Sequence, residues 1–120
     1  MLSLPAGVRI LLAREPADMR KSFDGLAALV QQALHADLFS GQWFVFRGKR
    51  GDRLKVLCWD GDGLVIYYKR LEKGSFRFPP MPADAARLEV RASDLAMILD
   101  GIDVTRVKRQ PRYQRPAATD

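Results

Sequence analysis

Residues 44–63 read FVFRGKRGDRLKVLCWDGDG. Two runs rich in aromatic and β-branched residues flank a glycine-containing loop at 48–52, and the second run ends in a turn at 60–63. Glycines at both places supply the positive φ angles that tight hairpins need. Together with the apolar run that follows, this pattern predicts an antiparallel β-meander of three strands: Trp43–Arg47, Arg53–Trp59 and Leu64–Arg70.

The first loop of this meander is strongly basic. Between residues 47 and 55, five cations stand against Asp52, a local net charge of +4; residues 104–120 hold five cations against Asp120, another +4. The whole chain carries +6, so the remainder sums to −2. Charge gathered in this way predicts a polyanionic partner, and the phosphates of DNA are the first candidate. The predicted nucleic-acid-binding residues are Arg47, Lys49, Arg50, Arg53 and Lys55 around the loop, Lys69 and Arg70 on the neighbouring strand, and Arg106, Lys108, Arg109, Arg112 and Arg115 in the tail.

The rest of the chain predicts further elements around the meander. Residues 8–13 are typical of a strand, and Asp18 is a suitable N-cap for a helix at 19–35 whose apolar residues recur at helical spacing. Residues 76–78 and 87–91 predict short strands, the second at a sheet edge, and residues 94–99 predict a short helix capped by Ser93.

The predicted fold class is therefore α+β: an antiparallel β-meander sheet packed by one long N-terminal helix, with a short C-terminal helix and a basic tail. Apolar periodicity is almost absent after Val104. We therefore predict a single domain at residues 1–103 and a basic extended or disordered tail at residues 104–120.

Aromatic residues share these strands with the basic side chains. Strand propensity alone explains most of them as core residues. Tyr67, which lies on the same strand face as Lys69, is the best candidate for exposure and for stacking on an unpaired base.

The sequence lacks the residues that several classes of function need. Cys58 is the single cysteine, which predicts a reducing compartment, and the sequence offers neither a signal-peptide pattern nor an apolar run that would span a membrane, so we expect a cytoplasmic protein without membrane contact. No phosphate-binding loop and no zinc-spaced Cys/His cluster is found, so no catalytic residue, metal or cofactor is predicted. A two-metal nuclease stays an alternative, with candidate ligands Asp18, Asp24, Asp52, Asp60 and Asp62.

Several runs together resemble one protein family. They are DMRKSFDGLAALV (18–30), FSG (39–41), VFRGKRGDRLK (45–55), WDGDGL (59–64), YKRLE (68–72) and LDGID (99–103). Over about residues 8–103 the chain resembles the small accessory-protein family, called TnpB, of bacterial insertion sequences of family 66. This family is unrelated to the RNA-guided nuclease of the same name.

The resemblance implies a role in transposition. The elements also encode a separate, larger transposase with acidic catalytic residues, and the small protein is implied to be needed without being the strand-transfer enzyme. We therefore expect a non-catalytic accessory protein that binds DNA through the basic hairpin and tail. The alternative is an adaptor that binds the transposase through an apolar sheet face or the short C-terminal helix. The oligomeric state is left open.

Overall fold

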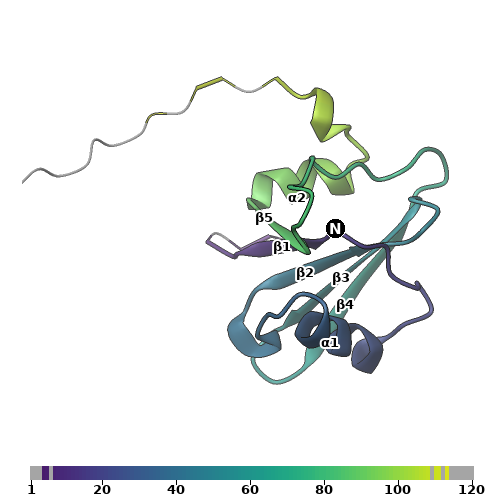
Figure 1. The fold of residues 1–120 in the computed structure, drawn as a ribbon, viewed down its shortest axis with the longest axis vertical. Helices are drawn as coiled ribbons and strands as arrows, with labels where there is room; N and C mark the ends of the chain where they lie inside the picture. The colour runs from purple at the N-terminus through teal and green to yellow at the C-terminus, as the bar shows by residue number, and fades with distance from the viewer. Residues whose placement is uncertain (1–3, 6, 109, 112, 114–120) are drawn as a thin grey trace, which may run out of the picture.

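The structure, a computed structural model, describes residues 4–5, 7–108, 110–111 and 113. Five strands form one sheet in the order β4-β3-β2-β1-β5 (Figure 1). The elements in chain order are β1 (Ile10–Ala13), α1 (Phe23–Gln32), the 3-10 helix η1 (Leu38–Ser40), β2 (Trp43–Arg47), β3 (Arg53–Trp59), β4 (Leu64–Arg70), β5 (Arg87–Val90), α2 (Ala92–Leu99) and the 3-10 helix η2 (Val104–Arg106). No helix in these ranges is long and apolar enough to cross a bilayer.

The sheet is mixed, which corrects the prediction of an antiparallel meander sheet. The meander β2-β3-β4 is present, but β1 joins it in parallel with β2, and β5 then pairs antiparallel with β1. A parallel neighbour needs a crossover connection, and here the chain between β1 and β2 carries α1. The strand predicted at residues 8–13 thus corresponds to β1, which has a strand on either side.

The predicted long N-terminal helix is also wrong, because α1 covers only Phe23–Gln32. Asp18 does not cap it. Its carboxylate accepts a hydrogen bond from the backbone N–H of Arg20 at 2.9 Å, and its carbonyl accepts one from the N–H of Lys21 at 3.0 Å. These bonds close a separate turn before the helix. At the other end, His35 has a φ of 50°, a left-handed conformation that a helix cannot continue through.

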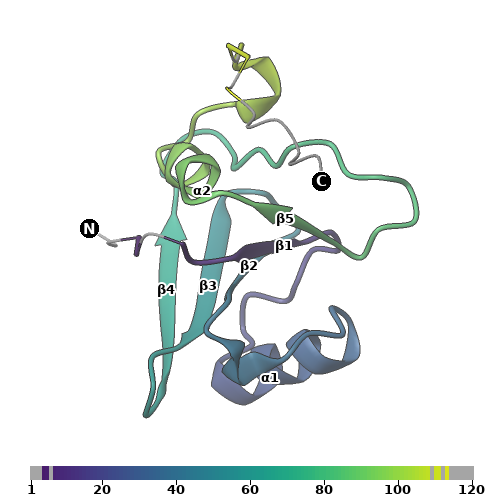
Figure 2. The same cartoon turned by 90° about the vertical axis from the view of Figure 1, so that its left-hand side faces the viewer.

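The sheet is covered on both faces, so the fold has three layers. Figure 2 shows α1 on one side and α2 on the other. Successive side chains of β1 point to opposite faces of the sheet and so contribute to both cores. Leu11 packs with Leu26 and Phe44 on the α1 side, and Ile10 packs with Leu95 on the α2 side. Burial on both faces explains why residues 10–13 are apolar without a break.

Two further segments differ from expectation. The predicted strand at 76–78 forms no strand; Phe76 and Phe78 instead insert into the core on the α2 side. Val104 is buried and begins η2, so the described part of the tail starts with a folded turn. The division of the chain at residue 103 stays a prediction.

Candidate functional site

The loop between β2 and β3 is held in place by backbone hydrogen bonds. The N–H of Gly48 donates to the carbonyl of Arg53 and the N–H of Gly51 to that of Gly48, both at 3.0 Å. Gly51 has a φ of 80°, a conformation that favours glycine. Its carbonyl in turn accepts from the N–H of Phe76 at 2.7 Å. The basic loop is therefore fixed at its tip by a distant, buried segment.

A second loop, residues 17–20, lies beside it. The N–H of Ala17 donates to the carbonyl of Arg47 at 2.9 Å, and Ala17 forms an isolated parallel bridge with Gly48. The two loops touch so closely that a Cβ at Gly48 would lie 2.8 Å from Cγ of Met19. A side chain at position 48 would therefore force Met19 to shift, which favours glycine where the two loops meet.

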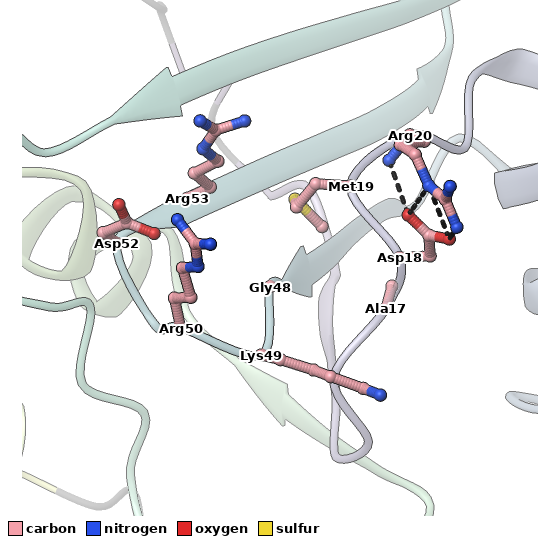
Figure 3. Close-up of a pocket in the computed structure, with 9 residues that line it drawn as sticks. All are labelled: Ala17, Asp18, Met19, Arg20, Gly48, Lys49, Arg50, Asp52 and Arg53. Carbon is pink, nitrogen blue, oxygen red and sulfur yellow. Dashed lines mark hydrogen bonds and ion pairs between the residues drawn. The ribbon is translucent and has the colours of Figure 1, made fainter.

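These loops line a groove of about 510 Å³, which we call the basic groove (Figure 3). In this view Arg50, Asp52 and Arg53 lie on the left, Asp18 and Arg20 lie on the right, and the Lys49 side chain extends across the lower part of the picture. Four cations against two carboxylates give the lining a net charge of +2. Ala17, Met19 and Gly48 complete the lining.

The free positive charge of the groove comes from the β2–β3 loop. Asp18 and Arg20 form a 2.7 Å ion pair, and this neighbour holds the pKa of the Asp18 carboxyl well below its usual range. Among the described residues, the exposed side chains of Lys49 and Arg50 have no hydrogen-bond or ion-pair partner. Arg53 is half-buried and donates to the hydroxyl of Tyr68 at 3.1 Å.

Three of the predicted DNA-binding cations point into the protein instead. Lys55 is 7% exposed, donates from Nζ to the carbonyl of Lys21 at 2.6 Å and lies 4.6 Å from the ring centroid of Tyr68. Lys69 donates from Nζ to the carbonyl of Leu99 at 2.5 Å, at the C-terminus of α2, where a cation is favoured by the helix dipole. Both ammonium groups therefore serve the fold.

Arg47 is the third of these. Its guanidinium lies 4.4 Å from the ring centroid of Phe78, and its Nη1 donates to the carbonyl of Phe76 at 3.4 Å. Burial, with a smaller effect from Arg77, lowers the pKa of Arg47. The side chain thus anchors the segment that fixes the loop tip.

The remaining predicted residues lie at the surface or outside the described chain. Arg70 is exposed, stands opposite Arg53 in the β3–β4 ladder and pairs with Glu72 at 2.8 Å. Arg106 pairs with Asp103 at 3.5 Å, and Lys108 is exposed. Arg109, Arg112 and Arg115 lie outside the described residues.

Sequence reasoning missed Arg20 as part of the site. Its charge is nearly balanced locally by Asp18, so a count of net charge passes over it; only the nearness of the two loops reveals it. The expectation for the aromatic residues also changes, because Tyr67 packs against the core on the α2 side while Tyr68 is 46% exposed.

The carboxylates that a nuclease would use do not converge. Asp18 and Asp52 line the basic groove, whereas Asp60 and Asp62 follow the far end of β3 and Asp24 lies in the first turn of α1. A seven-residue strand is about 23 Å long. Among the described residues, no group of three or more His, Cys, Asp and Glu is placed to hold a metal ion.

Comparisons with known proteins agree with the resemblance found in the sequence. The family described as IS66 Orf2 like protein matches residues 8–109. "Uncharacterized protein y4jC" of Sinorhizobium fredii is 44% identical over 116 residues, which cover 97% of each chain. "Uncharacterized protein y4hO" of the same organism is 39% identical over 102 residues, covering 83% of this chain and 87% of the relative. Neither name records an enzymatic activity, and no solved structure matches.

Proposed function

The chain belongs to the IS66 Orf2-like family of insertion-sequence proteins, and we propose that it is a cytoplasmic, non-catalytic accessory protein that binds DNA through the basic groove. The observation that carries this proposal is the pair of exposed cations, Lys49 and Arg50, which have no partner in the part of the chain that the structure describes. They lie beside Arg53 and Arg20 on two loops held by backbone bonds. Arginine and lysine side chains suit phosphate oxygens, which accept several charge-assisted hydrogen bonds at once.

A preformed groove favours binding because the loops need little further ordering. The β2–β3 loop is bonded to itself and to Phe76, so the cations start from a fixed backbone. In this proposal the cations of the basic tail make further contacts with DNA phosphates. Lys108, near the described start of the tail, is exposed. Phosphate contacts of this kind position a protein on DNA without reading its sequence.

The test is the salt dependence of DNA binding by the full chain, measured by fluorescence anisotropy. The combined change Lys49→Ala, Arg50→Ala and Arg53→Ala should weaken binding and reduce the slope of log Kobs against log salt by about 2.7, since each duplex phosphate contact contributes about 0.9. A slope that stays unchanged would contradict the proposal.

Two single variants provide a control matched in charge. Arg50→Ala and Arg9→Ala each remove one arginine charge, but Arg9 lies at the opposite end of β2 from the groove and pairs with Glu89. Arg50→Ala should lower the slope by about one, and Arg9→Ala should leave it unchanged. Equal effects would mean that only net charge matters.

One observation favours the adaptor as a second candidate function. Phe39 is 60% exposed and packs edge-to-face on Trp59, with centroids 5.0 Å apart, at the end of β3 away from the groove. The predicted adaptor surfaces fit less well, because both sheet faces are covered and α2 buries Leu95 and Ile98 internally. Phe39→Ser should abolish capture of the element's transposase while DNA affinity stays unchanged; retained capture would exclude this surface.

A further inference from the structure

β4 is an outermost strand of the sheet, and among the described residues its outer edge pairs with no strand (Figure 2). The strand has the sequence LVIYYKR, without proline, and Val65 and Tyr68 are 39% and 46% exposed. A long apolar edge with unpaired backbone groups is a template for a further strand, and proteins usually protect such edges.

The ladder with β3 determines which backbone groups face outward. The N–H of Leu71 donates to the carbonyl of Asp52 at 2.8 Å, and the N–H of Asp60 donates to the carbonyl of Gly63 at 3.0 Å. Hydrogen-bonded pairs alternate along an antiparallel ladder, so residues with odd numbers in β4 bond to β3. The N–H and C=O groups of the even-numbered residues point to the free edge: Leu64, Ile66, Tyr68 and Arg70.

The two ends of this edge carry opposite charges, so two antiparallel copies of the edge would be complementary. Asp60 and Asp62 precede the strand and Arg70 ends it. Within the chain, Arg70 stands opposite the like-charged Arg53 and pairs with Glu72 at 2.8 Å, and Lys73 adds a further positive charge at this end. A second β4 running antiparallel would bring the acidic start of one strand beside the basic end of the other.

We propose that β4 pairs antiparallel with β4 of a second copy of this chain, in a register centred on Ile66. In this register Leu64 stands opposite Tyr68 of the partner subunit, so the outward backbone groups of both strands meet. The turn that carries Asp62 then lies nearest to Arg70 of the partner subunit, twice by symmetry. The pairing joins two five-stranded sheets into one and sets the two basic grooves at opposite ends.

Charge exchange between two variants tests the proposal. Sedimentation velocity of the full chain from about 1 to 100 µM should show a dimer. Asp62→Arg and Arg70→Asp, each alone, reverse one partner in both symmetric pairs and should raise the dimer Kd about tenfold or more. Mixing the two variants restores opposite charges in both pairs, so a heterodimer should form. A monomeric wild type, unchanged single variants, or no heterodimer from folded variants would overturn the proposal.

A backbone variant provides an independent test. Ile66→Pro removes an N–H that points to the free edge and is not used by β3, so the variant should fold and be monomeric. Where this variant fails to fold, the charge exchange still decides. The triple groove variant should dimerise like the wild type, because the pairing uses none of the three groove residues and does not depend on DNA binding.

Discussion

Lys55→Met, compared with Lys49→Met, separates a cation that holds the fold from one that is free to bind. Methionine keeps an apolar stem of similar length and removes the ammonium. At position 55 the change removes a charge-assisted hydrogen bond worth about 1.5–3 kcal/mol and a cation–π contact worth about 0.5–1 kcal/mol. Relief from burying a charge offsets part of this loss. We expect a net destabilisation of about 2 kcal/mol.

The measurement is urea unfolding followed by circular dichroism. With an m-value of about 2 kcal/mol/M, Lys55→Met should lower the midpoint by about 1 M without changing m. Lys49→Met removes an exposed ammonium group that has no partner among the described residues, so the free energy of unfolding should stay within about 0.5 kcal/mol of the wild-type value. For DNA binding the order reverses: Lys49→Met should lower the salt slope by about one, and Lys55→Met should leave it unchanged. A Lys55→Met variant with normal stability and a reduced slope would refute this assignment.

Three further predictions concern packing at the basic groove, at α2 and in β3. Lys69→Met should destabilise the fold by about 1 kcal/mol in urea unfolding, because the carbonyl of Leu99 loses its cationic donor; no loss would show that this contact is replaced by water. Gly48→Ala should cost about 1–2 kcal/mol, since its Cβ meets Met19, and adding Met19→Ala should recover most of that loss; an unrecovered loss would place the strain elsewhere. Burial raises the pKa of the Cys58 thiol, so iodoacetamide should alkylate it more slowly at pH 8 than a free thiol and at the ordinary rate in urea; equal rates in the folded protein would contradict its burial.

The sequence predicts the local elements of this fold better than their arrangement. Glycines at 48, 51, 61 and 63 mark the two hairpin turns, and β2, β3 and β4 have the bounds expected from them. The parallel partner of β1 has no such local mark, because its pairing with β2 depends on where the crossover through α1 returns. The uninterrupted apolar run at 10–13 is a signal of burial on both faces, but it names no neighbour.

Charge counting limits the prediction of the site in the same way. Lys49 and Lys55 lie six residues apart and contribute equally to local charge, yet Lys49 is exposed and Lys55 is buried, with 7% of its surface exposed. The difference arises because Lys55 lies mid-strand opposite Tyr68, beneath the turn that precedes α1, which no local pattern reveals. Arg20 has the converse problem, since its neighbour Asp18 hides it from a count of net charge.

The length of β3 gives the proposed interactions a common geometry. Its start carries the basic groove and its end carries Phe39, Trp59 and the acidic turn, about 23 Å apart. At that separation, beyond two Debye lengths at physiological salt, a charge change at one end should hardly alter the field at the other. Asp62→Arg, which adds positive charge near the turn, should therefore leave the salt slope for DNA of the monomer unchanged, measured below the dimer Kd, while weakening self-association. A steeper slope in a monomeric Asp62→Arg variant would mean that DNA reaches along the strand to the turn, and the two ends would then be one site.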